Sequence, residues 1–278
     1  MKSTGVDQYL NPVDMRAMTS RIPSPRGSRV SAGGVRKIPR YQRDRIRRAA
    51  VELLRLAKQT MTYREVSRIT GLCITAISRY VRSHVVPGFD RALMLWKTLD
   101  PLVGLQATLV RTVKTGPVVD VQTVIGDPSI LSLAAADCLA RYAGYRVTKI
   151  MTAAVNGIPL AAAVAQVINA RLVIARTSRP VDGGELLETV YTRNGESVEY
   201  LYLPSRLVSH TDSVLIVDDM VRTGRTVRAI QRLLERVKPK DGRRPEVAGV
   251  YCLIGFRDAV ERLRESGLRV ECALEVVE

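Results

Sequence analysis

Histidine, cysteine and long apolar runs are scarce in this sequence, and each scarcity excludes a class of protein. The only two histidines, His84 and His210, leave no basis for a Ser-His-Asp triad or a histidine metal site. The four cysteines are far apart with no C-x-x-C pair, so neither a disulfide framework nor a zinc site is indicated. The longest apolar run, residues 158–167, has about half the length that a membrane-spanning helix needs. Because the first thirty residues also lack the apolar core of a signal peptide, we expect a cytoplasmic protein with no membrane contact.

Acidic residues are in deficit as well. The chain has 43 Lys and Arg against 27 Asp and Glu, a net charge of +16, which favours a polyanionic partner such as nucleic acid or a phosphorylated metabolite. Residues 1–100 hold 20 of the basic and 7 of the acidic residues, a net charge of +13. The length of 278 residues exceeds that of a usual single domain, so two domains are expected and the basic charge belongs to the first.

The first segment, residues 1–40, is rich in Pro, Ser, Gly and Arg and has no apolar period. This composition predicts a basic flexible tail, and such tails can follow a phosphate backbone. Two alternatives stay open: an extension without function, and an overextended start upstream of Met15 or Met18.

Residues 41–100 are predicted to form a helical domain. From Tyr41 the apolar residues recur every three or four positions, which indicates an amphipathic helix. Thr62 and Glu65 form a capping box that begins a short second helix, and Gly71 ends it. A third helix is expected from about residue 74 to residue 83, and a connector helix follows the break at Pro87-Gly88. Leu72, Ile74 and Ile77 are expected to face the core around the turn.

The two short helices and their glycine-containing turn resemble the helix-turn-helix of DNA-binding regulators. In that arrangement the second helix enters the major groove, where Arg79 and Arg82 can reach guanine edges or phosphates. The residues expected to contact double-stranded DNA are Cys73, Thr75, Ser78, Arg79 and Arg82. A helical hairpin that does not bind DNA is the alternative, and the net charge of +13 favours DNA. Because such modules usually read paired half-sites, we expect a homodimer.

Residues 101–278 alternate β-branched apolar runs with helical patterns, which predicts an α/β domain with a parallel sheet. A polar stretch with two alternating segments around Asn194-Gly195 predicts a β-hairpin. Strands are expected near 118–124, 146–152, 171–176, 213–218, 246–254 and 268–276, and helices near 128–142, 158–169, 225–237 and 258–266.

The most informative segment is residues 213–230, SVLIVDDMVRTGRTVRAI. It reads as a buried strand, two consecutive carboxylates, and a Thr/Gly loop that opens a helix. Asp218 and Asp219 fall at the carboxyl end of the strand, where parallel sheets place ligands, and they can accept hydrogen bonds from adjacent sugar hydroxyls. The loop 222–226 can hold a phosphate with backbone N–H groups and threonine hydroxyls. The spacing is not that of a Walker A loop, so a ribose 5-phosphate is expected rather than a triphosphate.

The segment VLIVDDMVRTGRT resembles the phosphoribosyl pyrophosphate (PRPP) motif of type I phosphoribosyltransferases, and the likeness covers roughly residues 105–278. The resemblance implies the Rossmann-like parallel sheet of that family, with ribose hydroxyls at the two aspartates and the 5-phosphate at residues 223–226. It also implies Mg²⁺ that arrives with PRPP near the two aspartates, without a direct protein metal site. The PRPP-binding residues implied in this way are Val155, Asn156, Gly157, Arg176, Asp218, Asp219, Met220, Val221, Arg222, Thr223, Gly224, Arg225 and Thr226.

The sequence also departs from the enzymes of that family. Adenine-type enzymes carry an acidic-Ala-Arg-Gly run in the pyrophosphate loop, whereas residues 154–157 hold no cation. Orotate-type enzymes usually have an Arg-Lys pair after the next strand, whereas Arg176 is followed by Thr177, and Arg193 is the only cation between residues 180 and 204. No catalytic residue is therefore assigned, and whether the chain is an enzyme stays open.

The T-x-x-x-x-G-I-P-L-A pattern from Thr152 is similar to the purine operon repressor of Gram-positive bacteria. A helix-turn-helix ahead of such a domain also resembles archaeal PRPP-binding transcription regulators of the GfcR type. We therefore expect a DNA-binding regulator of nucleotide or central-carbon metabolism genes that senses PRPP or a related phosphorylated ribose or nucleotide. One alternative is an active adenine or orotate phosphoribosyltransferase, and another is an RNA-binding regulator of the attenuation type.

Overall fold

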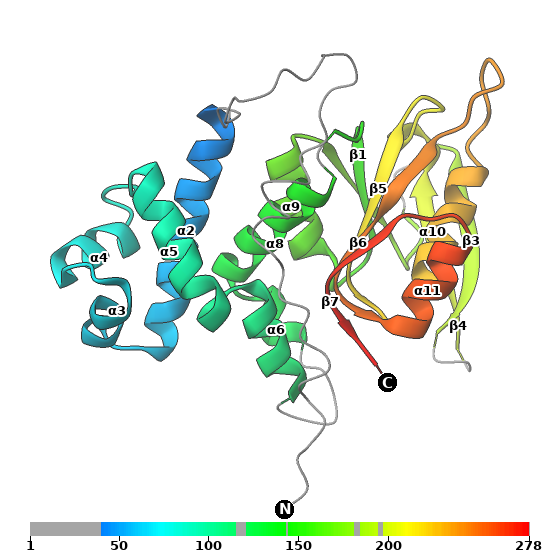
Figure 1. The fold of residues 1–278 in the computed structure, drawn as a ribbon. Helices are drawn as coiled ribbons and strands as arrows, with labels where there is room; N and C mark the ends of the chain where they lie inside the picture. The colour runs from blue at the N-terminus through cyan, green and yellow to red at the C-terminus, as the bar shows by residue number, and fades with distance from the viewer. Residues whose placement is uncertain (1–39, 115–120, 143, 181–183, 194–196, 278) are drawn as a thin grey trace, which may run out of the picture.

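The computed structural model describes residues 40–114, 121–142, 144–180, 184–193 and 197–277. Helices α2 to α5 form one side of the molecule, the β-sheet forms the other, and α8 and α9 lie between them (Figure 1). Among the described residues, no helix has both the length and the apolar character that a bilayer span requires. The predicted basic tail falls outside the described residues.

The predicted helical region is present. Its elements are α2 (Arg40–Thr60), α3 (Tyr63–Thr70), α4 (Ile74–Val81) and α5 (Phe89–Val103). The long helices α2 and α5 pack on each other, and α3 and α4 sit at their end. Their shared core is apolar, with Leu53, Leu54, Ile77, Leu95 and Leu99 all fully buried.

The turn between α3 and α4 has the local signals that the sequence predicts. Thr62 and Glu65 form a reciprocal capping box at the start of α3, and Gly71 ends the helix in the left-handed region with φ 68°. The Ser67 hydroxyl donates to the Leu72 carbonyl at 2.6 Å and so closes the turn. The prediction that Ile74 faces the core is wrong, because its side chain is 43% exposed. The buried side of α4 is centred on Ile77 and Tyr80, and Ile74 lies at the edge of that side.

The segment after α5 contains α6 (Leu105–Lys114), α7 (Val121–Ile125) and α8 (Pro128–Arg141). The strand predicted near 118–124 is wrong in its described part, since Val121 onward is helical. Val121, Val124 and Ile125 are all buried, and their spacing places them on one side of a helical turn. The Asp127 carboxylate caps α8 by accepting from two backbone N–H groups. The β-branched residues suggested a strand, but their burial follows a helical period.

The other predicted strands form one five-stranded sheet, in which every pair is parallel and the order is β2-β1-β5-β6-β7. They are β1 (Lys149–Ala153), β2 (Arg171–Ala175), β5 (Ser213–Val221), β6 (Glu246–Phe256) and β7 (Val270–Val276). The helices between them are α9 (Ile158–Ile168), α10 (Arg225–Glu235) and α11 (Arg257–Glu265). Alternate residues of β5 face opposite sides: Leu215 joins the apolar cluster with α8 and α9, and Ile216 joins the cluster with α10 and α11. The sheet is thus covered on both faces, as the continuous apolar strands predict.

The predicted hairpin is also present, as β3 (Leu186–Arg193) and β4 (Ser197–Pro204) in antiparallel register. A short 3-10 turn, Ser205–Leu207, follows β4. The hairpin joins the sheet edge through a bridge between Arg176 and Tyr202. Leu201 and Leu203 are fully buried in the cluster that contains α10, so the hairpin packs against the same face as that helix.

The helical region and the sheet share one core. Helix α2 packs on α8, and a single apolar cluster continues from Leu53 and Leu99 through Leu133 to Leu215 of β5. Helix α5 runs across the predicted boundary between residues 100 and 101. The two regions are therefore joined by packed helices, and their division into separate domains stays a prediction.

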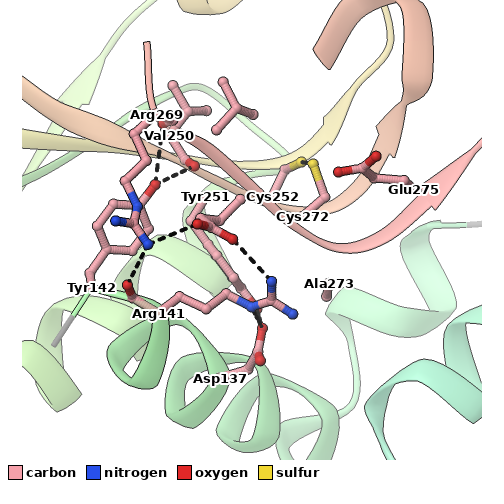
Figure 2. A network of polar contacts seen from close by, with 12 residues as sticks. Asp137, Arg141, Tyr142, Val250, Tyr251, Cys252, Arg269, Cys272, Ala273 and Glu275 are labelled. Atoms are coloured by element: carbon pink, nitrogen blue, oxygen red, sulfur yellow. Dashed lines mark hydrogen bonds and ion pairs between the residues drawn. The ribbon is translucent and has the colours of Figure 1, made fainter. Parts of the chain in front are cut away.

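A polar network fastens α8 to β6 and β7 (Figure 2). Asp137 accepts from Arg141 Nε at 2.7 Å and from the Tyr251 hydroxyl at 2.9 Å. Arg141 also reaches Glu271 at 3.1 Å, and Glu271 pairs with Arg269 at 2.8 Å. Burial and the neighbouring Asp137 raise the pKa of Tyr251 well above its usual value, so its hydroxyl keeps its proton and donates. The network fixes how the helix between the two regions sits on the sheet.

Asp100, in the last turn of α5, gives a test of this junction. Burial, and then repulsion from Asp137, raise the pKa of Asp100 to about 6. Between about pH 4 and pH 6 the native protein therefore binds more protons here than the unfolded chain, so the free energy of unfolding falls as pH rises. Asp100→Asn removes this effect. Urea denaturation is expected to show the variant about 1–2 kcal/mol more stable than wild type at pH 8 and equal to it at pH 4. A variant less stable at pH 8 would contradict this assignment.

Candidate functional site

The candidate site is built where β1 and β5 end. The two strands are parallel neighbours, with Ile150 opposite Leu215. The loop 154–157 leads from β1 to α9, and the loop 222–224 leads from β5 to α10. Loops at the carboxyl edge of a parallel sheet leave a crevice into which helix N-termini point. The sequence therefore brings the two candidate loops to the same edge of the sheet although 64 residues of chain lie between them.

The acidic pair lies at the end of β5, as predicted. Asp219 is 8% exposed and Asp218 is half-buried. The backbone N–H of Asp219 donates to Asp218 Oδ1 at 3.0 Å, which orients the first carboxylate. Two carboxylates next to each other at a strand end provide acceptors for neighbouring hydroxyl groups, and each such charge-assisted bond is worth about 1.5–3 kcal/mol.

The loop after the acidic pair has the geometry of an anion cradle. Gly224 is the N-cap of α10 in the left-handed region with φ 75°, and a Cβ there would lie 3.1 Å from Leu263. The backbone N–H of Arg225 donates to the Thr223 hydroxyl at 3.4 Å. Thr223 is exposed and Thr226 is half-buried. Hydroxyls and backbone N–H groups thus gather at the N-terminus of an eleven-residue helix, where negative charge is stabilised.

The loop 154–157 lies directly against the acidic pair. Val155 is 72% exposed and Asn156 is exposed, whereas Gly157 is buried. A Cβ on Gly157 would clash with Thr152 Oγ1 and would lie 2.8 Å from Asp218 Oδ1. No side chain fits in that space, so glycine lets the two loops touch. The Ala154–Val155 peptide bond in this loop is cis.

The remaining predicted ligand residues surround these loops. Arg176 lies beyond β2 with an exposed side chain, and its backbone pairs with Tyr202 of the hairpin at 3.0 and 2.8 Å. Arg222 is exposed, with its guanidinium 5.6 Å from the centre of the Phe256 ring at the end of β6. Met220 is half-buried and Val221 is 1% exposed. The Val221 side chain belongs to the core, so only its backbone faces the site.

The predicted DNA-contacting residues form a second, separate group on α4. Cys73, Thr75, Arg79 and Arg82 are exposed, and Ser78 is half-buried. Cys73 is the N-cap of α4 and Arg82 is its C-cap, so the group covers the whole outer side of the helix. Tyr80 and Ile77 hold the opposite side in the core. The outward direction of both arginines agrees with the helical spacing.

Comparison with known proteins identifies the fold. The model of the phosphoribosyl transferase domain matches residues 131–275. The chain belongs to this family. The matched segment begins inside α8, contains both loops and the acidic pair, and includes all five strands of the sheet except for the last residue of β7.

Two kinds of curated relative are similar to the phosphoribosyltransferase domain. The purine biosynthesis transcriptional repressor PurR of Bacillus subtilis is 29% identical over 141 residues, which are 50% of this chain and 47% of the repressor. The xanthine phosphoribosyltransferase of Bifidobacterium longum subsp. infantis is 28% identical over 173 residues, 60% of this chain and 87% of the enzyme. The chain thus spans about half the length of the repressors it matches.

Solved structures of adenine phosphoribosyltransferases superpose on this chain. The adenine phosphoribosyltransferase of Thermoanaerobacter pseudethanolicus superposes with a TM-score of 0.52 at 18% identity, over 62% of this chain and 99% of that one. The enzyme of Rhodothermus marinus gives a TM-score of 0.51 at 24% identity, over 62% and 98%. These similarities establish the type I phosphoribosyltransferase fold of this part of the chain.

Sequence reasoning missed one residue beside the loops of the phosphoribosyltransferase domain. Gln122 of α7 donates from Nε2 to Asn156 Oδ1 at 3.1 Å. Because residues 118–124 were predicted as a strand, nothing placed Gln122 near the loop. Its position depends on how α7 packs, and no local motif signals that packing.

Proposed function

We propose that this protein is a transcription regulator that binds double-stranded DNA through α4 and senses PRPP, or a related phosphorylated ribose or nucleotide, at the end of β5. The observation that carries the proposal is that one chain combines two candidate sites. Arg79 and Arg82 are exposed on the second helix of a helix-turn-helix-like pair, and an acidic pair adjoins a glycine loop on the sheet. The similarity to purine repressors supports it, and target genes in nucleotide or central-carbon metabolism follow from it.

In this proposal each loop binds one part of the ligand. Asp218 and Asp219 accept from the ribose hydroxyls, and residues 223–226 bind the 5-phosphate at the N-terminus of α10. Residues 155–157 contact the pyrophosphate, with Gly157 buried between Thr152 and Asp218. Arg176, Arg222 and Arg225 add positive charge around an anionic ligand.

Magnesium fits this site only together with the ligand. Within the described part of the chain, no group of three or more His, Cys, Asp or Glu side chains could hold a metal ion. Two carboxylates alone leave most of the octahedral positions of Mg²⁺ empty, and this ion is commonly bound by one or two carboxylates plus substrate phosphates. We propose that Mg²⁺ enters with PRPP and neutralises its charge beside Asp218 and Asp219.

The DNA site also implies an assembly. A single α4 covers only one half-site, and helix-turn-helix proteins read two half-sites about 34–36 Å apart as dimers. We propose a homodimer that presents two copies of α4. The surface that would join the copies is not assigned.

An active phosphoribosyltransferase is the second candidate function. The similarity to xanthine phosphoribosyltransferases, which extends over 87% of one such enzyme, favours it. Against it stands the loop 154–157, whose sequence Ala-Val-Asn-Gly brings no cation to a reaction that is catalysed largely by placed charge.

A turnover assay beside calorimetry separates the two functions. The protein is mixed with Mg²⁺ and PRPP and with adenine, guanine, hypoxanthine, xanthine, orotate or uracil. We expect saturable PRPP binding, no pyrophosphate release with any base, and a changed affinity for DNA taken from immediately upstream of the gene. Sustained release of pyrophosphate with one base, without any effect of PRPP on DNA binding, would favour the enzyme.

A further inference from the structure

A line of polar contacts connects the ligand loop 154–157 with the end of α4. It begins at Asn156, which accepts from Gln122 of α7 at 3.1 Å. Helix α7 is five residues long and runs into the turn that opens α8. Asn156 is therefore linked to the start of α8 through one short, packed element.

Two hydrogen bonds continue from the start of α8 to α2. Gln59 donates to Asp127 Oδ2 at 2.6 Å, while the other oxygen of the same carboxylate caps α8. The Ser129 hydroxyl donates to Glu52 Oε2 at 2.9 Å. Gln59 and Glu52 are seven residues apart, so both bonds fall on the same side of α2. The N-terminus of α8 is thus held to α2 at two points.

The last contacts lead from α2 to α4. Glu52 pairs through its other oxygen with Arg55 at 2.7 Å. Arg55 Nε donates to the Val81 carbonyl at 3.3 Å, and Arg55 Nη2 donates to the Ser83 hydroxyl. Val81 is the last residue of α4, and Ser83 follows with φ 59°. One guanidinium therefore fixes the carboxyl end of the helix that carries Arg79 and Arg82.

The surroundings allow these side chains to change partners. Ser129 is 7% exposed and the Glu52 side chain 16%, so their bond is shielded from water and stronger than a surface contact. Arg55, Gln59 and Gln122 line an open groove of about 640 Å³ between α2 and the α7–α8 turn, and Asp127 and Ser129 line it as well. The groove gives these side chains room to adopt a second arrangement. Coupling between two sites requires an element that has two such arrangements.

We propose that Gln122, Asp127, Gln59, Ser129, Glu52 and Arg55 form a relay by which ligand at the loop 154–157 changes the position of α4. Gln122 donates to Asn156 Oδ1, whereas an anion would accept from Asn156 Nδ2. An anion that turns this amide group toward itself therefore moves Oδ1 and alters the first contact of the relay. Three of the helices involved, α2, α4 and α7, precede the matched family segment, which starts at residue 131. All six relay residues lie ahead of that segment, so the relay joins the helical region to the phosphoribosyltransferase domain. It rests on the proposed function, since it explains how PRPP would regulate DNA binding.

The test uses the double variant Q59A and S129A, which removes both hydrogen bonds between α2 and the start of α8. Neither residue is part of the proposed ligand or DNA sites. The affinity for a duplex from immediately upstream of the gene is measured by fluorescence anisotropy, with and without saturating Mg²⁺ and PRPP. In wild type PRPP is expected to change this affinity by at least about five-fold, the lower range of common allosteric couplings. In the double variant the change is expected to fall below about two-fold, with the affinities for PRPP alone and for DNA alone within about three-fold of wild type.

A control variant removes a side-chain hydrogen bond elsewhere in the protein, between a helix and the sheet. Gln106 of α6 donates to the Ala273 carbonyl at 3.3 Å and lies outside the relay. Gln106→Ala is expected to keep the full effect of PRPP on DNA binding. Loss of coupling in this control as well would show a general loosening of the structure and would overturn the relay.

A second measurement does not depend on DNA. Hydrogen exchange of the amides in residues 74–84 is followed with and without Mg²⁺ and PRPP, and a change is expected in wild type but not in the double variant. An unchanged response in the double variant overturns the relay and leaves the proposed function intact. If the wild type binds PRPP without any effect on DNA affinity, the proposed regulation is overturned. The hydrogen exchange of residues 74–84 then still tests whether PRPP changes α4 through the relay. A wild type that binds no PRPP overturns both.

Discussion

Replacing Asp218 and Asp219 together by asparagine is expected to abolish PRPP binding in a calorimetric titration. Each carboxylate is proposed to accept from a ribose hydroxyl, and two lost charge-assisted bonds amount to about 3–6 kcal/mol, or a loss of at least about 100-fold. The fold should survive, because asparagine has the same shape and its oxygen can still accept from the backbone N–H of residue 219, as Asp218 does now at 3.0 Å. The circular dichroism spectrum and the melting temperature check this.

The control for this experiment also removes two negative charges, but at the far end of α10. Glu235 is the last residue of that helix and Asp241 lies in the loop beyond, and both are exposed. Glu235→Gln with Asp241→Asn is expected to leave the PRPP affinity within about two-fold of wild type, since exposed charges at that distance are largely screened. Retained binding in the Asp218 and Asp219 variant would refute the ligand site.

Replacing Arg79 and Arg82 together by alanine is expected to weaken DNA binding by more than about 30-fold, which corresponds to about 2 kcal/mol. Both side chains are exposed on α4, and alanine is a good helix former, so the helix should persist. The slope of log affinity against log salt should fall by about 1 for each phosphate contact that is lost. The PRPP affinity should not change, since α4 lies outside the ligand loops.

A matched control shows whether the effect is specific to α4. Arg243 and Arg262 are exposed arginines of the phosphoribosyltransferase domain, and their double replacement by alanine removes the same charge. DNA affinity in this control should stay within about three-fold of wild type. If the control loses as much affinity as the α4 variant, DNA is held by overall charge and not by α4.

Much of the ligand site could be predicted because its signals are local. Asp218 and Asp219 follow a run of five buried residues, so the strand itself could be predicted from apolar character, although β5 continues to Val221, three residues beyond the predicted end. Gly224 adopts φ 75° at the start of α10, a conformation that favours glycine and that the Thr-Gly pattern indicates. The same holds for α3, where Thr62, Glu65 and Gly71 define both ends by hydrogen bonds within a few residues.

Other features could not be predicted because they depend on packing between distant segments. Four of the five residues 121–125 are β-branched and suggested a strand, yet the segment forms α7 against α8. Ile74 was expected in the core and is 43% exposed, because the direction of α4 is set by Ile77 and Tyr80 against α2. Gln122 reaches Asn156 only because that packing brings α7 next to the loop.

The sequence by itself determined the five strands of the parallel sheet, the helices between them, the position of the acidic pair near the carboxyl end of β5, and the outward side of α4. These depend on periodicity, caps and turn residues, which act over a few positions. Only the tertiary structure decided that α2 lies on α8, that Glu52 meets Ser129, that Arg55 meets Val81 and that Gln122 meets Asn156. The physical reason is that a surface polar residue has no preferred partner in the sequence. Its partner is chosen when the burial of apolar side chains, which dominates the free energy of folding, fixes which helices pack together.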